Sequence, residues 1–228
     1  MDEKKPSIDF SSILASCVHD MKNSLSMVIN TLDDITDNDA HAHPEEIERL
    51  KYESKRVNNQ LVQLLALYKI GNKQYFLNIT ETNVRDFVEE TLIPHVDLLK
   101  KRNIALKIEI DNELIWYFDE ALVKSVINNI VNNAYQYTKD QVCISAKLNN
   151  NNLKLCITDN GNGYPEEMLH KFEKTQKTSI NVNTGSTGLG LFFCRQVADL
   201  HTNKKKSGSI ELDNNGIDGG GRFTLSLP

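Results

Sequence analysis

The sequence predicts an α+β chain in which an N-terminal helical hairpin precedes an α/β layered sandwich. Two observations lead to this fold class. Two segments before residue 71 carry apolar residues at heptad spacing, and beyond them short alternating patterns typical of strands mix with helical patterns. The length of 228 residues suits one small domain and one of ordinary size, which we place at 1–71 and 72–228.

Each of the two N-terminal segments contains a mainly apolar stripe whose successive members are alternately three and four residues apart. The first stripe consists of Leu14, Val18, Met21, Leu25, Val28, Leu32 and Ile35, and the second of Ile47, Leu50, Ser54, Val57, Leu61, Leu64 and Tyr68. The polar residues 36–44 between them end in Pro44 and read as a turn. A lone hairpin buries little apolar surface, so we expect a homodimer through residues 8–70 that forms a four-helix bundle. The alternative is a hairpin that packs on the rest of its own chain.

Gly71 and Asn72 punctuate the end of the second helix, and strands and helices follow in mixed order. Strands are expected at 74–80, 104–110, 114–118, 142–148, 153–158, 209–212 and 222–227, and helices at 83–101, 119–138 and 188–201. The four asparagines 149–152 read as a turn, and the polar residues 173–187 separate the middle strands from the last helix. This order favours an α/β layered sandwich.

Composition and charge exclude several classes of protein. The chain is 39% apolar and 25% charged, as globular proteins are. Its net charge of −5 argues against a nucleic-acid-binding surface, and the basic run 204–206 reads as a solvated loop. No apolar stretch approaches the ~20 residues that span a bilayer. Residues 1–10 lack the apolar core of a signal peptide, so we expect a cytoplasmic protein.

Metal sites built from cysteine or histidine are not indicated. The four cysteines show no CxxC spacing and are expected to be free thiols of a reducing compartment: Cys17, Cys143, Cys156 and Cys194. His41 and His43 lie in a loop without carboxylate partners and read as solvated side chains.

The helix expected at 119–138 has an asparagine-rich interior, which runs against helix propensity. Asn129 and Asn133 are four residues apart and therefore share a face. Their amide oxygens could ligate a hard cation such as Mg²⁺, or the face could simply be exposed to solvent.

Two glycine-rich segments follow. Asp159, Gly161 and Gly163 come directly after an apolar strand, where the carboxylate could accept a hydrogen bond from an exocyclic amine such as that of adenine. The same residues could also form an ordinary turn. Residues 185–190 open a helix, and glycines there expose backbone N–H groups to an anion such as phosphate. Their spacing matches neither the Walker nor the Rossmann pattern.

Taken together, these motifs resemble a known family. The asparagine helix, Asp-x-Gly-x-Gly after a strand and Gly-x-Thr-Gly-Leu-Gly-Leu at a helix start are similar to the N, G1 and G2 boxes of the GHKL (Bergerat) ATPase fold, which histidine kinases, Hsp90, gyrase B and MutL share. Phe172 resembles the F box, and residues 208–228 resemble the closing hairpin of a histidine-kinase catalytic domain. The resemblance covers residues 75–228.

The N-terminal helix indicates the subfamily, because residues 19–23 (His-Asp-Met-Lys-Asn) resemble the H box of sensor histidine kinases. His19 follows the stripe residue Val18, so it lies at the edge of the expected bundle, where a second domain can reach it. The resemblance implies an ATP-dependent protein-histidine kinase that autophosphorylates His19 and passes the phosphoryl group to an aspartate of a response regulator. Phosphatase activity on that aspartate is a further expectation.

The resemblance also implies residue roles. His19 attacks the γ-phosphorus, Asp20 accepts the proton from the other ring nitrogen or holds the reactive tautomer, and Asn23 orients the water of the phosphatase reaction. Asn133 ligates Mg²⁺, and residues 173–187 form a mobile ATP lid. The residues implied in nucleotide binding are Asn129, Asn133, Tyr137, Asp159, Gly161, Gly163, Thr187, Gly188, Leu189 and Gly190.

The chain departs from the family pattern at two positions. Ser24 stands where the H box usually has proline, so the usual helix kink is not expected. Gln136 stands where a basic residue often follows the N-box asparagine. A contact to the γ-phosphate could then come from Lys139, or from Lys174 or Lys177.

Two other functions compete with a kinase. One is a histidine phosphotransfer scaffold with a vestigial ATPase domain, but scaffolds of that kind lose the nucleotide motifs, which look intact here. The other is an ATPase that acts by conformational clamping and needs no His19. No sensor region precedes the kinase core in this sequence, so the chain is either a piece of a longer protein or takes its input from a partner, and Met1 slightly favours the partner.

Overall fold

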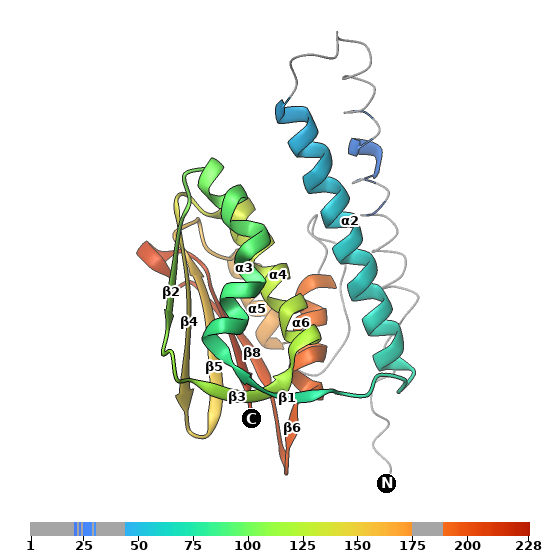
Figure 1. Cartoon of the computed structure of the whole chain (residues 1–228), viewed down its shortest axis with the longest axis vertical. Coiled ribbons are helices and arrows are strands. Elements are labelled where there is room, and N and C mark those ends of the chain that lie inside the picture. The colour runs from blue at the N-terminus through green and yellow to red at the C-terminus, as the bar shows by residue number, and fades with distance from the viewer. Residues whose placement is uncertain (1–20, 22, 24, 29, 31–43, 175–188) are drawn as a thin grey trace. The chain divides into compact units, whose positions relative to one another are not determined.

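A computed structural model describes residues 21, 23, 25–28, 30, 44–174 and 189–228 (Figure 1). The chain divides into two compact units, which are described separately. The long helix α2 (Pro44–Gly71) belongs to the first, and residues 76–174 and 193–228 belong to the second. Among the described helices, none combines the length and the apolar character that crossing a membrane requires.

Helix α2 covers the second heptad segment. It begins at Pro44 and ends at Gly71, after which Asn72 donates its backbone and side-chain N–H groups to the Tyr68 carbonyl at 3.1 and 3.0 Å. Lys73 then adopts a φ of 56°, which turns the chain out of the helix. Most of the first heptad segment lies outside the described residues, and so does the expected hairpin turn at 36–43, so the four-helix bundle remains a prediction.

The second unit is built on a mixed sheet of five strands in the order β2-β4-β5-β9-β8. Their bounds are β2 Ala105–Ile110, β4 Gln141–Asn149, β5 Asn152–Asp159, β8 Ser209–Asp213 and β9 Arg222–Leu227. Strands β2 and β4 are parallel, and the other neighbours are antiparallel. The expected asparagine turn joins β4 to β5, where Asn150 and Asn151 have φ angles of 51° and 60°, as a tight hairpin turn requires.

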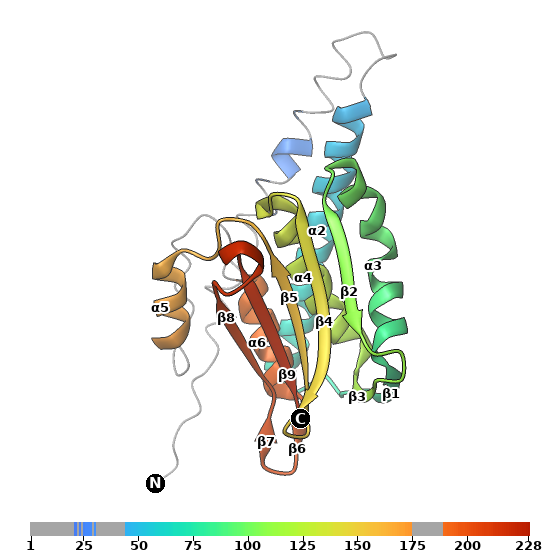
Figure 2. The same cartoon turned by 90° about the vertical axis from the view of Figure 1, so that its left-hand side faces the viewer.

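Three helices cover one face of this sheet: α3 (Val84–Lys101), α4 (Glu120–Tyr137) and α6 (Leu189–Leu200), the last from Phe193 onward (Figure 2). Side chains alternate along the strands, so Ile144, Ile157 and Phe223 lie side by side on the covered face, and each is at most 2% exposed. The opposite face carries mainly polar side chains. The predicted α/β layered sandwich is therefore confirmed for this unit.

Smaller elements differ from expectation. The strand expected at 74–80 begins only at Ile79: β1 (Ile79–Asn83) pairs with β3 (Ile115–Asp119), while residues 74–78 form no strand. The apolar run before β1 was misleading, because Phe76 is 87% exposed and takes no part in a ladder. Helix α5 (Glu166–Lys174) lies beside β8 and was not predicted. The basic run 204–206 is exposed as expected, but its turn, Lys204 and Lys205, joins two short strands, β6 (Thr202–Asn203) and β7 (Lys206–Ser207).

A buried joint around Asp119 connects β1, α4 and α6. The Asp119 carboxylate caps α4 by accepting from Leu122 N at 3.0 Å, and its second oxygen accepts from Asn78 N at 2.9 Å. The Asp119 N–H donates to His201 Nε2 at 3.0 Å, while His201 Nδ1 bonds the Val197 carbonyl at 2.7 Å. These contacts require the neutral imidazole with its proton on Nδ1. Burial lowers the pKa of His201, which keeps this form in the folded chain.

We predict that protonation of His201 destabilises the fold. Because its pKa lies below 6.5 when folded, the unfolded chain binds more protons, so the free energy of unfolding falls as pH decreases through about 6.5. His201→Phe leaves the Asp119 N–H without its acceptor and should lower the free energy of unfolding at about pH 8 by roughly 1–3 kcal/mol. It should also flatten the pH dependence in urea unfolding curves. The exposed His170 provides the control, since His170→Phe should do neither.

Candidate functional site

Asp159 lies at the carboxyl end of β5, on the face of the sheet that the helices cover. It shares this face with Leu153, Leu155 and Ile157 because side chains alternate along the strand. Its Oδ1 accepts from Gly161 N at 2.7 Å and from Gly221 N at 3.4 Å. Within the described part of the chain Oδ2 accepts no hydrogen bond, so this oxygen can receive a donor from a ligand.

The loop after Asp159 packs directly on the last turn of α4. A Cβ atom at Gly161 would lie 2.3 Å from the Tyr137 carbonyl oxygen and 2.9 Å from Asp159 Oδ1, so only glycine fits. Gly163 has a φ of +73°, which favours glycine, and its position is fixed by Asn214. Asn214 accepts from Tyr164 N at 2.7 Å and donates to the Tyr164 carbonyl at 2.9 Å.

Helix α4 presents a polar stripe formed by Asn129, Asn133 and Tyr137, which are spaced by four residues. Asn133 and Tyr137 are exposed, and Asn129 is half-buried. The stripe ends beside the loop, because the Tyr137 carbonyl faces Gly161. Asn129 Nδ2 lies 3.5 Å from the Cys194 sulfur, which directs the amide oxygen away from α6. The structure therefore places the C-terminal end of the predicted N-box helix, at Tyr137, against the predicted G1 loop at Gly161.

Electrostatics around the loop are set by burial. Burial, followed by the Asp159 charge, raises the pKa of Tyr164, so its phenol stays neutral. Burial also raises the pKa of Cys194 to about 12, so its thiol is not a nucleophile at neutral pH. The described residues contain no cluster of three or more histidine, cysteine or carboxylate side chains suited to a metal ion. A cation here would depend on amide oxygens, phosphate oxygens and water.

Several predicted residues cannot be placed in this site. Leu189 and Gly190 are the first two residues of α6 that the structure describes. Thr187 and Gly188 lie outside the described residues, as do the catalytic candidates His19 and Asp20 and the expected lid from residue 175 onward. Asn23 is helical and exposed and belongs to the first unit. Their predicted roles stay predictions.

Two residues that sequence reasoning missed organise the site. Asn160 is 6% exposed and bonds Thr138, Asp140 and Gln141, and Asn214 clamps the Tyr164 backbone as described above. Asparagine beside glycine reads as turn chemistry in a sequence, and this concealed both roles. A signal for Asn160 was its place inside the Asp-x-Gly-x-Gly motif. Asn214 gave none, because its partner is 50 residues away.

The arrangement can hold a planar base with an exocyclic amine. Asp159 supplies an acceptor, the cradle at Gly161 admits a ligand close to the backbone, and the stripe on α4 supplies amide oxygens and an aromatic ring. Amide oxygens are ligands that Mg²⁺ accepts, so the residues present fit a magnesium nucleotide.

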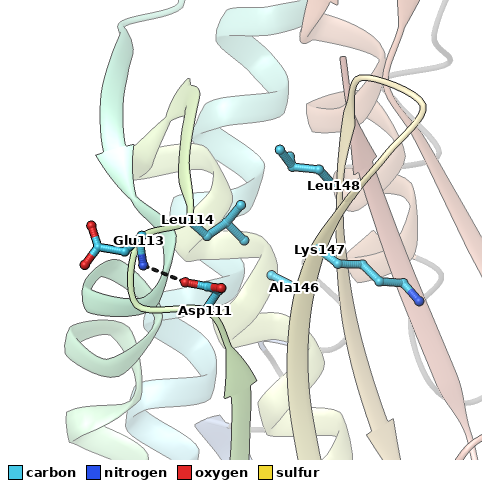
Figure 3. Close-up of a pocket in the computed structure, with 6 residues that line it drawn as sticks. All are labelled: Asp111, Glu113, Leu114, Ala146, Lys147 and Leu148. Carbon is cyan, nitrogen blue, oxygen red and sulfur yellow. Dashed lines mark hydrogen bonds between the residues drawn. The ribbon is translucent and has the colours of Figure 1, made fainter.

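A separate hollow of about 330 Å³ lies at the far end of the sheet, and Figure 3 shows its lining residues. They are Asp111, Glu113, Leu114, Ala146, Lys147 and Leu148. Leu148 pairs with Leu153 beside the β4–β5 turn, whereas Asp159 pairs with Val142 at the other end of the same ladder. The hollow is therefore distinct from the site around Asp159.

Comparison with known families supports the nucleotide interpretation. Residues 118–228 match the family model described as "Histidine kinase-, DNA gyrase B-, and HSP90-like ATPase". The sensor protein SrrB of Staphylococcus aureus (strain NCTC 8325 / PS 47) is 24% identical over 224 residues, which is 94% of this chain. The same match covers 37% of SrrB, so the chain spans little more than a third of that relative's length.

Solved structures share the fold. Acinetobacter baumannii histidine kinase AdeS superposes with a TM-score of 0.65 at 20% identity, covering 92% of this chain and 96% of that one. The catalytic domain of histidine kinase ThkA gives a TM-score of 0.55 at 26% identity, covering 66% of this chain and 95% of that one. A complex of ThkA with the response regulator TrrA gives 0.58 at 21% identity, covering 95% of this chain and 61% of that one.

We predict that Gly161→Ala disables the site. The added methyl group meets the Tyr137 carbonyl, so the loop must move away from α4, and affinity for a fluorescent ATP analogue should fall at least about tenfold, which is about 1.4 kcal/mol. Gly71→Ala is the matched control, because a Cβ there meets nothing within 4 Å. Equal affinity of the Gly161→Ala and Gly71→Ala chains would contradict the assignment.

Proposed function

Because residues 118–228 match the model of the ATPase domain found in histidine kinases, gyrase B and Hsp90, and the chain is similar to a sensor histidine kinase, we propose that it is an ATP-dependent protein-histidine kinase. One observation carries the proposal: the loop that holds Asp159 and Gly161 packs against the last turn of α4, the helix that bears Asn129 and Asn133. Together they form a site suited to a magnesium adenine nucleotide.

Each residue of the proposed site contacts a different part of the magnesium nucleotide. Asp159 Oδ2 accepts from the adenine amino group, and Gly161 and Gly163 let the backbone approach the nucleotide. The oxygen of Asn133 ligates Mg²⁺, with Asn129 beside it. Bound Mg²⁺ neutralises charge on the phosphates, and the protein supplies position.

The proposed acceptor is His19 of the first unit. Its neutral imidazole forms a nitrogen–phosphorus bond to the γ-phosphorus as the bond to the ADP oxygen breaks. Asp20 accepts the proton from the other ring nitrogen or holds the reactive tautomer. Thr187, Gly188, Leu189 and Gly190 are the residues proposed to complete the contacts to the phosphates, on the ground of their glycine-rich sequence.

We predict that γ-labelled ATP transfers an acid-labile, base-stable label to the chain. His19→Gln should abolish the label while nucleotide binding persists, because the substitution removes the nucleophile and leaves the second unit intact. Asn133→Ala should reduce the labelling rate at least about tenfold, because a proposed Mg²⁺ ligand is lost. The measurement is initial labelling rate at saturating Mg-ATP.

Asn58→Ala controls for substitution of an exposed asparagine outside the site and should leave the rate unchanged. A wild type that binds ATP but never acquires label would favour a phosphotransfer scaffold. A His19→Gln chain that acquires as much label as wild type would exclude His19 as the acceptor.

The proposed partner is the receiver domain of a response regulator, which takes the phosphoryl group onto an aspartate. The solved complex of histidine kinase ThkA with the response regulator TrrA supports a partner of this class. We also propose a phosphatase reaction in which Asn23 orients the attacking water. Asn23→Ala should slow dephosphorylation of the receiver aspartate while His19 labelling continues, and equal dephosphorylation rates would refute that role.

We further propose a homodimer through residues 8–70, in the cytoplasm, where ATP is available. Leu61 and Tyr68 of the predicted stripe, with Leu65 next to them, are 50%, 46% and 55% exposed in the single chain. Apolar side chains at heptad spacing that one chain leaves exposed are suited to a second copy.

Sedimentation should therefore give twice the 25.9 kDa of one chain. Leu61→Glu combined with Leu65→Glu should shift the chain to the monomer, because charge would be buried in the seam. Asn58→Glu adds charge at an exposed position of the same helix and should leave the dimer intact. A wild type that sediments as a monomer at all concentrations would contradict the bundle.

A further inference from the structure

We infer that Asn160, paired with Asp140, is a positioning residue for nucleotide binding: it fixes the loop that carries Asp159 to the end of α4. This inference rests on the proposed function. Asn160 is 6% exposed and has no role in the chemistry proposed above. Its side chain instead points back into the segment between α4 and β4.

The carboxamide oxygen of Asn160 lies close to three donors of that segment. Its Oδ1 lies 2.9 Å from the Thr138 hydroxyl, 3.1 Å from Asp140 N and 3.0 Å from Gln141 N. Its Nδ2 donates to Asp140 Oδ1 at 2.7 Å. The backbone adds a fifth contact, from Asn160 N to the Gln141 carbonyl at 3.3 Å. The side chain of Asn160 therefore connects the segment after α4 to the loop through hydrogen bonds.

Only a carboxamide meets this set of contacts. Its oxygen accepts from several donors while its nitrogen donates to a carboxylate, and no other side chain of this size does both. A carboxylate would place two acceptors where Asn160 Nδ2 now meets Asp140 Oδ1. An apolar side chain would leave the Asp140 and Gln141 N–H groups and the Thr138 hydroxyl without this acceptor.

The contacts act on the site because Asn160 lies between two of its residues. Asp159 precedes it, and Gly161, which follows it, lies against the Tyr137 carbonyl. Thr138, which bonds Asn160, directly follows Tyr137 at the end of the stripe. The carboxamide thus sets the separation between the adenine acceptor and the stripe, and a shift of the loop would disturb both sides at once.

The test exchanges the amide of Asn160 and the carboxylate of Asp140. Asn160→Asp faces the Asp140 carboxylate with another and should weaken binding of Mg-ADP, measured by calorimetry, at least about tenfold. Asp140→Asn is the matched control: its amide oxygen still accepts from Asn160 Nδ2, so affinity should stay within about twofold of wild type. The double variant puts the amide at position 140 and the carboxylate at position 160, which restores a donor–acceptor pair and should recover affinity to within about threefold.

Thermal unfolding without nucleotide accompanies each titration, and affinities are compared below the unfolding range of the weakest variant. Thr138→Val removes one donor to the carboxamide and provides a milder change, with an expected loss of about threefold, should Asn160→Asp not fold. Wild-type affinity in Asn160→Asp, or a double variant as weak as the single one, would overturn the inference. If wild type binds ADP and only these comparisons fail, the proposed function stands; if wild type binds no ADP, both fall.

Discussion

The close approach of the Gly161 backbone to the Tyr137 carbonyl is the constraint on which the site depends. A Cβ atom at position 161 would lie 2.3 Å from that oxygen, so there is no room for one. The loop and the last turn of α4 therefore form one packed surface. Asp159 and α4 are separated in sequence by β4 and most of β5, and this contact brings the loop after Asp159 against the end of α4. The Asn160 carboxamide and the Asn214 clamp hold the loop from two sides, so its position follows from packing as well as from its own turn geometry.

The other end of α4 is held by different chemistry. Asp119 caps the helix and bonds the chain entering β1, and His201 accepts from its backbone N–H. Helix α4 is therefore fixed at its first turn by the buried hydrogen bonds of Asp119 and His201, and at its last turn by the contact with Gly161. A helix fixed at both ends can present Asn129 and Asn133 at a constant place, which is what positioning of a nucleotide requires.

The sequence allowed much of this architecture to be predicted, for physical reasons that differ between elements. Alternation and helical period located β4, β5, β9, α3 and α4, because each buries one face on the same core. Phe76 misled the prediction of β1, since an exposed aromatic residue has the pattern of a strand without the burial. Spacing together with resemblance predicted roles for Asp159, Asn129 and Asn133. Asn160 and Asn214 act through partners distant in sequence, which no local pattern reveals.

The central claim is that residues 129–163 form the adenine and magnesium end of a nucleotide site. A crystal structure of the chain with Mg²⁺ and a non-hydrolysable ATP analogue tests it most directly. We expect the exocyclic amine within hydrogen-bond distance, about 3 Å, of Asp159 Oδ2, and the Asn133 oxygen on the metal. A nucleotide bound elsewhere, for example in the hollow at the far end of the sheet, or with its base turned away from Asp159, would contradict the account.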